Sequence, residues 1–146
     1  MELNDETLRF IREHCKDDVR SLALQAPKYP GVDMPVALTQ IAGRQAAAEK
    51  IPSWHEEEGV LYPRHLSLEQ CSSEATARYK ASIIPEFSSG TLADLTGGFG
   101  IDCAFLSPKF HHVTYVERQE VLCEIASHNF PLLGLNHIRI ENKDGI

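Results

Sequence analysis

The most constraining feature of this sequence is a glycine-rich run, Thr96-Gly97-Gly98-Phe99-Gly100, that lies directly between two apolar segments. Residues 91–95 have the length and composition of a short buried strand, and residues 101–106 begin a helical pattern. Glycines at such a junction let the backbone turn sharply and let a ligand approach without meeting a Cβ atom. A chain with this junction is expected to hold a ligand at the carboxyl end of a sheet.

Around this junction, residues 91–146 alternate between strand-like and helix-like patterns. Short apolar or β-branched runs predict parallel strands near 91–95, 112–117 and 138–141. Helices are expected between them, over 101–106 and 119–133. Pro131 interrupts the second helix and Gly134 closes it. This order is half of a doubly wound parallel sheet, and such short apolar runs predict strands that are buried on both faces.

Residues 1–85 carry helical periodicity instead. Asn4 is expected to cap a first helix, which breaks near Asp17-Asp18. Asp33 is expected to cap a second helix that reaches about Lys50. The remaining expected segments are a loop over 27–31, an extended stretch over 60–63 and a helix over 73–84.

The two patterns together predict an α/β fold with two regions: a helical N-terminal region over 1–85, and the first half of a truncated Rossmann-like domain over 86–146. The formal charge of −7 argues against a strongly basic nucleic-acid module. No apolar run is long enough to span a bilayer, the acidic N-terminus does not resemble a secretory signal, and the four cysteines form no C-x-x-C pair. We therefore expect a cytoplasmic protein with reduced thiols, no membrane partner and no metal.

Acidic residues surround the glycine run and indicate which ligand it holds. Glu117 ends the second strand, 17 residues beyond Gly100, and this spacing suits a carboxylate that accepts hydrogen bonds from two ribose hydroxyls. Asp144 follows the third strand and is expected to line an adenine edge. Asp94 and Asp102 would repel a pyrophosphate, but they suit a ligand that carries an ammonium and a sulfonium. That is the charge pattern of S-adenosylmethionine.

Two other functions compete with this interpretation. A nicotinamide-dependent oxidoreductase is disfavoured because Cys103 occupies the third glycine position of the G-x-G-x-x-G pattern. A helical RNA- or protein-interaction module without catalysis, whose Rossmann-like half only folds around it, is the other alternative. Cys103 and Cys123 are expected in the core, and Trp54 and Tyr62 are expected to pack between the two regions rather than to stack on a base. Three upstream basic residues could contact an RNA phosphate but are more often only solvated: Arg64, Arg78 and Lys80.

Residues 91–146 resemble the first half of a class I S-adenosylmethionine-dependent methyltransferase, whose first motif is an acid followed by alternating glycines. Thr96 replaces the usual first glycine, as in several RNA methyltransferases. The run from Asn129 to Leu135, then Ile138, resembles the N-x-x-x-x-G-[LV]-x-x-I pattern of the trimethylguanosine synthase-like group. Upstream, residues 68–81 are similar to the segment before the core in bacterial proteins that carry a C-terminal THUMP-like domain.

This resemblance implies S-adenosylmethionine as the cofactor of the intact protein and RNA, ribosomal or transfer, as its substrate. It also implies in-line transfer of the methyl group to a nucleophilic nitrogen or oxygen, with positioning as the main contribution of the enzyme. The positions assigned to cofactor binding are Asp94, Thr96, Gly97, Gly98, Gly100, Asp102, Glu117, Arg118 and Asp144.

The sequence also departs from the family. Class I cores have seven strands with the catalytic motif after strand four, whereas this sequence stops at Ile146 and contains no Asp-Pro or Asn-Pro dipeptide. We therefore expect an N-terminal fragment that has no catalytic residue and is inactive by itself. Without a fourth strand, residues 91–95 would form a free sheet edge. This edge is expected either to mediate self-association or to be covered by the helix over 73–84.

Overall fold

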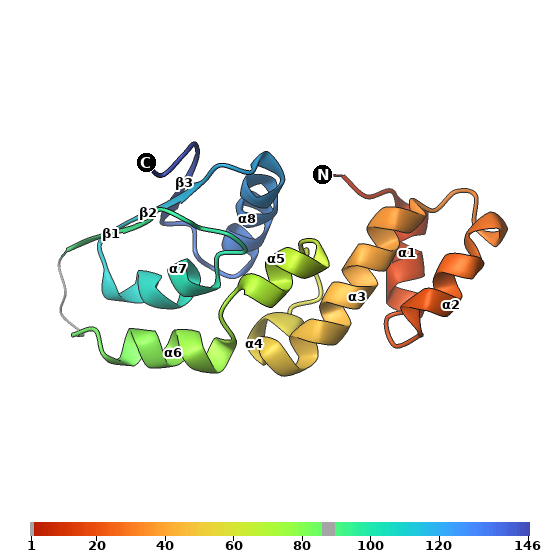
Figure 1. Ribbon diagram of the computed structural model, residues 1–146, viewed down its shortest axis with the longest axis horizontal. Coiled ribbons are helices and arrows are strands. Elements are labelled where there is room, and N and C mark those ends of the chain that lie inside the picture. The colour runs from red at the N-terminus through yellow and green to blue at the C-terminus, as the bar shows by residue number, and fades with distance from the viewer. Residues whose placement is uncertain (1, 86–89) are drawn as a thin grey trace.

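The N-terminal end of the chain folds into helices in the computed structural model, which describes residues 2–85 and 90–146 (Figure 1). These elements are α1 (Asp5–Glu13), α2 (Val19–Leu24), the 3-10 turn η1 (Ala26–Lys28) and α3 (Met34–Lys50). Asn4, Asp18 and Asp33 cap α1, α2 and α3, and each side chain accepts a hydrogen bond from the amide three residues later. The caps at Asn4 and Asp33 and the break near Asp17-Asp18 confirm the prediction from sequence.

Three shorter helices connect this end of the molecule to the sheet: α4 (Pro52–His55), α5 (His65–Gln70) and α6 (Glu74–Ser82). Of these, the sequence predicted only α6. Pro52 begins a new helix where the sequence predicted an end, because proline fits the first position of a helix. The six residues of α5 are too few for a periodic signal.

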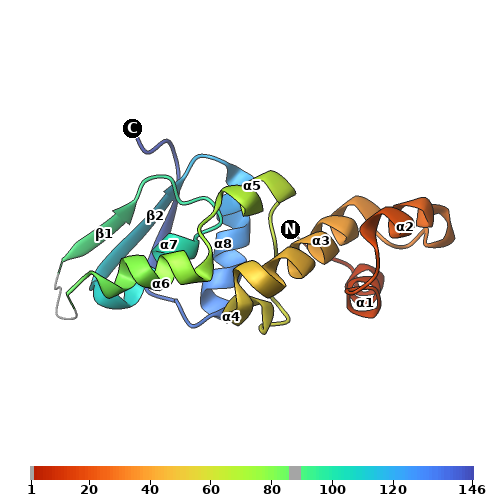
Figure 2. The same ribbon diagram turned by 60° about the horizontal axis from the view of Figure 1, so that its bottom comes forward.

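The apolar side chains of the described residues gather in two clusters, and α3 belongs to both. The first cluster joins α1 and α2 to the N-terminal part of α3, as far as Ile41. The second begins at Ala47 and includes buried residues of α4, α5, α6 and the sheet. The molecule is accordingly elongated, with α3 bridging its two ends (Figures 1 and 2). The expected division between residues 85 and 86 stays a prediction, since the helices after Ala47 share one core with the strands.

The second part of the chain is a parallel sheet in the order β1-β2-β3, and the parallel strands confirm the prediction. Its elements are β1 (Thr91–Asp94), α7 (Ile101–Leu106), the 3-10 turn η2 (Ser107–Lys109), β2 (His112–Glu117), α8 (Glu120–Leu132) and β3 (Ile138–Asn142). Asp94 is in register with Tyr115, and Glu117 with Asn142. The carboxyl ends of the strands therefore meet at one edge of the sheet.

The expectation that the strands are buried on both faces is wrong for β1 and β3. In β2 it holds only at Val116, which alternates with the core-facing Tyr115 and is 3% exposed. Alternate strand residues join the core on one face only: Leu92, Val113, Tyr115, Ile138 and Ile140. On the opposite face, Thr91, Ala93 and Arg139 are exposed. Both crossovers run in the same direction, from β1 to β2 and from β2 to β3, and right-handed crossovers then place α7 and α8 on the same face.

The outer edge of β1 was expected to be covered by the helix over 73–84 or to pair with another chain. Helix α6 packs lengthwise against α7 (Figures 1 and 2), while Thr91, Ala93 and Leu95 are exposed. Self-association through this edge stays a prediction. Within residues 2–85 and 90–146, no helix has the length and apolarity needed to cross a membrane.

Candidate cofactor-binding cleft

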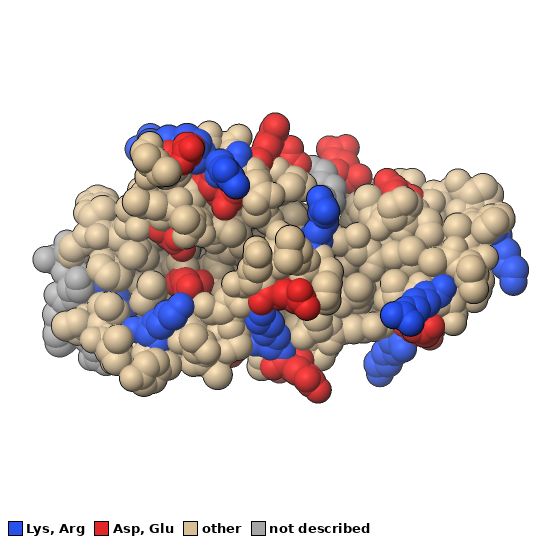
Figure 3. All heavy atoms as spheres, viewed as in Figure 1, with Lys and Arg blue, Asp and Glu red and all other residues tan. Residues whose placement is uncertain are grey.

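A cleft of about 760 Å³ opens at the carboxyl ends of β1 and β2, between the glycine run and the segment before α6. The fold brings all of the predicted cofactor-binding residues to its walls: Asp94, Thr96, Gly97, Gly98, Gly100, Asp102, Glu117, Arg118 and Asp144. Figure 3 shows acidic atoms within a hollow on this face of the molecule, with basic groups at its rim. The described residues contain no group of three or more His, Cys, Asp or Glu side chains that could hold a metal ion.

The glycine run forms a tight turn that is tied to β2. Gly98 and Gly100 have φ angles of +56° and +94°, a region that side chains rarely adopt. The amide of Gly97 donates to the carbonyl oxygen of Val116 at 2.9 Å. A Cβ atom on Gly97 would lie 2.2 Å from the ring of Tyr115. Glycine is therefore needed at 98 and 100 for the turn, and at 97 for close approach to the strand.

Tyr115, in β2, packs against the glycine turn and holds it by a hydrogen bond. The sequence motifs did not identify Tyr115 as a site residue. Its ring is fully buried, and its hydroxyl donates to the carbonyl oxygen of Gly98 at 2.5 Å. Burial raises its pKa far above the ordinary value for tyrosine, and nearby acidic groups, chiefly Cys123 and Glu117, add to this effect. The hydroxyl therefore stays a neutral donor. The signal in the sequence was a polar aromatic residue at an inward-facing position of an apolar strand.

Glu117 closes the turn from the end of β2. Its Oε1 accepts from the amide of Gly98 at 3.0 Å, and its Oε2 accepts from the amide of Gln119 at 2.7 Å. The residue is only 7% exposed. Each carboxylate oxygen can accept more than one hydrogen bond, so both retain capacity for a ligand hydroxyl. The side chain thus links the glycine turn to the start of α8 while it lines the cleft.

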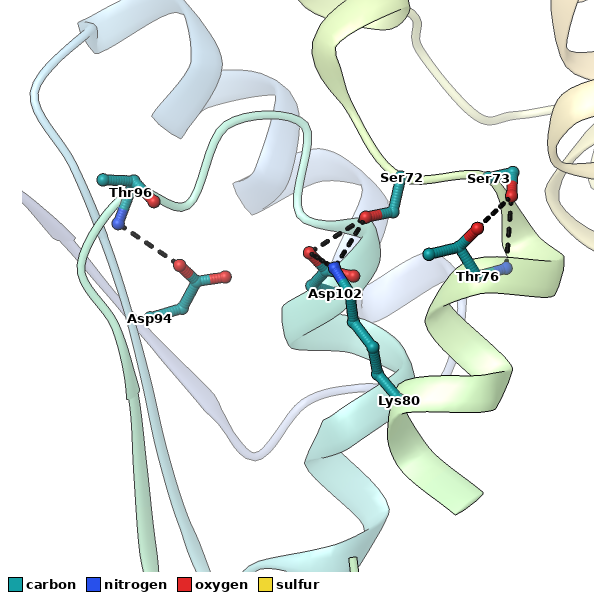
Figure 4. A network of polar contacts seen from close by, with 7 residues as sticks. All are labelled: Ser72, Ser73, Thr76, Lys80, Asp94, Thr96 and Asp102. Atoms are coloured by element: carbon teal, nitrogen blue, oxygen red, sulfur yellow. Dashed lines mark hydrogen bonds and ion pairs between the residues drawn. The ribbon is translucent and has the colours of Figure 1, made fainter. Parts of the chain in front are cut away.

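Asp94 and Asp102 form the acidic wall of the cleft (Figure 4). Asp94 Oδ1 accepts from the amide of Thr96 at 3.2 Å. Burial raises the pKa of Asp94 above its ordinary value, and the neighbouring carboxylates of Asp102 and Glu117 raise it further. The hydrogen bond from the Thr96 amide and the charge of Lys80 act in the opposite direction and lower this pKa, but burial outweighs them. A cationic group of a ligand beside Asp94 would also favour its charged form.

Asp102 is held by residues from the helical half of the chain (Figure 4). Its Oδ2 accepts from Ser72 Oγ at 3.0 Å and from Lys80 Nζ at 3.0 Å, and Lys80 Nζ also lies 3.1 Å from Ser72 Oγ. Its Oδ1 is buried and has no partner among the described residues. Lys80, considered above as an RNA-phosphate contact, is instead paired with this carboxylate.

Residues upstream of α6 form the opposite wall of the cleft. They are Ser67, Gln70, Cys71 and Ser72, and none was predicted as a site residue. The similarity of residues 68–81 to a segment that precedes methyltransferase cores was the signal that pointed to them. Arg64 and Arg78, the other two basic residues considered above as RNA contacts, do not line the cleft. Arg78 instead pairs with Glu74 at 2.9 Å and lies over the ring of Phe105.

The far end of the cleft is formed by the loops after β2 and β3. Arg118 and Asp144 both line it. Asn142 Nδ2 donates to the carbonyl oxygens of Glu117 and Arg118, each at 3.0 Å. Asp144 Oδ1 accepts from the amide of Ile146 at 3.1 Å. These contacts hold the two loops that carry the predicted residues Arg118 and Asp144.

Aromatic residues of the helical N-terminal region pack against Phe99 of the glycine turn. The ring of Phe99 lies 5.1 Å from that of Trp54 and 5.8 Å from that of Tyr62, measured between centroids. All of these rings are buried, which confirms the expected packing between the two regions. Cys103 and Cys123 are also buried, as predicted. The glycine turn is thus fixed by both halves of the chain.

Among solved structures, this chain is similar to a crystal structure of a "putative methyltransferase" from Porphyromonas gingivalis W83. The TM-score is 0.74 and the sequence identity is 27%. No protein-family model and no curated protein matches the sequence. The similarity covers 99% of this chain but 37% of that chain, so this chain spans little more than a third of the length of the solved protein. Over nearly its whole length, the chain is related to that methyltransferase-like protein.

Proposed function

We propose that this chain is the N-terminal, cofactor-binding part of an S-adenosylmethionine-dependent methyltransferase. The observation that carries the proposal is the contact between Glu117 and the amide of Gly98, at 3.0 Å within one cleft. This hydrogen bond joins Glu117, the acid expected to bind the ribose, to the glycine turn that is expected to contact the cofactor. The similarity to a "putative methyltransferase" along the whole chain supports the same function.

The residues present fit this cofactor. The cleft volume of about 760 Å³ is in the range of small-molecule sites, and the turn at Gly98 and Gly100 presents backbone without side chains. When bound, S-adenosylmethionine supplies the methyl group on a sulfonium. Glu117 would hold the ribose, Asp144 would face the adenine, and Asp94 would face the cationic end. A pyrophosphate would be repelled by the same carboxylates.

The first experiment is isothermal titration calorimetry of the purified chain with S-adenosylmethionine, its demethylated product S-adenosylhomocysteine, and NAD. We expect the two adenosyl ligands to bind at least about tenfold more tightly than NAD, a difference of about 1.4 kcal/mol. Tighter binding of NAD would reassign the cleft to a nicotinamide cofactor. Absence of binding by all three ligands would favour an interaction module.

A variant of Glu117 sharpens this experiment. Glu117→Ala removes a charged acceptor for the ribose hydroxyls and should cost about 1.5–3 kcal/mol of binding. Glu120→Ala is the matched control, since Glu120 is an exposed carboxylate at the start of α8. Because Glu117 also holds two backbone amides, thermal unfolding of each variant must show a folded protein. Unchanged binding in a folded Glu117→Ala variant would contradict its role at the ribose.

We further propose that the intact protein methylates ribosomal or transfer RNA. The support is Thr96 in place of the usual first glycine, as in several RNA methyltransferases, together with two resemblances. The run that begins at Asn129 resembles the trimethylguanosine synthase-like group, and residues 68–81 resemble bacterial proteins with a C-terminal THUMP-like domain. Electrophoretic mobility shift of the chain with bulk ribosomal and transfer RNA tests this part. We expect a shift that weakens with salt, and no shift with either RNA at low salt would count against an RNA partner in this part of the protein.

A further inference from the structure

We propose that Lys80 and Asp102 form a recognition pair for the α-amino acid end of the ligand. In this pair, Lys80 binds the α-carboxylate and Asp102 accepts the α-ammonium. The inference rests on the proposed function and deepens it, because it assigns a specificity-determining role to a residue of the helical half.

The excess of carboxylates in the cleft favours such a pair, because a ligand carboxylate beside them needs a neighbouring cation. Asp94, Asp102 and Glu117 all line the same cleft, and the raised pKa of Asp94 reflects both its burial and these neighbours. These groups favour an ammonium but oppose the carboxylate that an α-amino acid also carries. Any ligand with an amino acid end therefore needs a cation beside the acidic wall. The nitrogen of Lys80 supplies that cation, 3.0 Å from Asp102 Oδ2.

The hydrogen-bonding capacity of Lys80 leaves room for a ligand. An ammonium group has three N–H donors, and within the described residues the Lys80 ammonium makes two contacts, to Asp102 Oδ2 and Ser72 Oγ. Its side chain is 45% exposed. Lys80 does not itself line the cleft, but both of its partners, Ser72 and Asp102, do, so its remaining donor lies beside two residues of the cleft wall. Figure 4 shows these three residues together. A carboxylate there would meet a charge-assisted donor.

The two oxygens of Asp102 have different partners. Lys80 and Ser72 occupy Oδ2 and so fix the side chain. Oδ1 is buried and has no donor from the described residues. The Asp102 side chain as a whole is 35% exposed and lines the cleft. An ammonium would therefore approach Asp102 through this exposed part, where Lys80 and Ser72 hold the carboxylate in place.

Three ligands separate the contributions in calorimetry: S-adenosylhomocysteine, its decarboxylated analogue, which keeps the ammonium, and 5′-methylthioadenosine, which lacks both groups. Lys80→Met should weaken binding of S-adenosylhomocysteine about tenfold or more, while binding of the other two changes little. Lys80→Arg should restore most of the loss. Asp102→Asn should weaken binding of both amine-bearing ligands and spare 5′-methylthioadenosine.

The matched control is Lys143→Met. Lys143 forms a comparable exposed pair with Glu141 at 2.8 Å, and Glu141, unlike Asp102, does not line the cleft. Because the pair of Lys80 with Asp102 is partly exposed, its loss should cost little stability, and Lys80→Met should fold.

The outcomes distinguish the two proposals. If the wild-type chain binds none of the adenosyl ligands, the proposed function fails and this inference fails with it. If the wild-type chain binds S-adenosylhomocysteine and Lys80→Met binds it equally well, only this inference is overturned. An equal loss for all three ligands would also overturn it, since it would show a general structural effect of Lys80.

Discussion

The side-chain amide of Asn129, in α8, makes both of its hydrogen bonds with the backbone of a single residue, Leu61. Its Oδ1 accepts from the Leu61 amide at 2.9 Å, and its Nδ2 donates to the Leu61 carbonyl oxygen at 2.8 Å. Gln40, in α3, makes the equivalent pair of bonds with Tyr62, at 2.8 and 2.9 Å. Two buried amides thus satisfy an extended segment that belongs to no sheet of the described residues, and join α3 to α8 through it.

Replacing Asn129 tests how much its two hydrogen bonds to Leu61 contribute to the stability of the chain. Asn129→Ala leaves the part-buried amide and carbonyl of Leu61 without these partners, and we expect a loss of about 1–3 kcal/mol in the free energy of unfolding. Urea unfolding measures it. Asn136→Ala, at an exposed position just beyond α8, should change stability by less than about 0.5 kcal/mol. Equal effects of the two substitutions would show that the bonds to Leu61 contribute little.

The glycine turn makes a steric prediction. Gly97→Ala would place a Cβ atom against the buried ring of Tyr115, at 2.2 Å, and should destabilise the chain by about 2–3 kcal/mol or more. Gly134→Ala is the comparison, because that glycine has a φ of +77° and open space where a Cβ would lie; only backbone strain of about 1 kcal/mol applies there. Thermal unfolding ranks the two. A milder effect at Gly97 than at Gly134 would contradict the close packing beneath the turn.

Replacing Asp94 is expected to have opposite effects on the stability of the unliganded chain and on the binding of the cofactor. Burial, followed by the charges of Asp102 and Glu117, raises its pKa in the folded state. The folded chain therefore binds more protons than the unfolded chain between the ordinary and the raised pKa, and stability falls as pH rises through that window. Asp94→Asn should stabilise the unliganded chain at pH 7, with an advantage that disappears as the pH is lowered below the ordinary aspartate pKa of about 3.9.

The same substitution should weaken binding of S-adenosylmethionine, because the cationic end loses a charged partner. Urea unfolding from about pH 3.5, below the ordinary aspartate pKa, up to about pH 8, and calorimetry at neutral pH give the two measurements. A stability difference that stays constant over this pH range would exclude titration of Asp94 as its cause.

The exposed edge of β1 predicts self-association. β1 is an outer strand that pairs only with β2 among the described strands, and no lysine or proline protects it. Sedimentation velocity should show association that grows with concentration, and Ala93→Lys should shift the chain to monomer. A wild-type monomer at every concentration, with rapid amide exchange along residues 91–95, would rule out both pairing and cover of this edge.

The local features of the fold and of the site could be predicted from the sequence alone. Caps at Asn4 and Asp33, the glycine turn and the acid at Glu117 depend on residues that are near neighbours in the chain, so propensity and spacing reveal them. The parallel order followed from the alternation of strand and helix. The helix α5 escaped detection, because six residues carry no periodic signal.

Only the tertiary structure decided which distant residues meet. Asn129 and Leu61 are 68 positions apart, and Lys80 and Asp102 are 22 apart. No local pattern encodes such pairs, because they form only when the crossovers place α8 beside the extended segment and α6 beside α7. The burial of one sheet face likewise depends on where the crossovers place α7 and α8, not on the composition of the strands. Spacing could therefore predict the acids of the cleft, while the lysine that balances them came into view only when the two halves packed together.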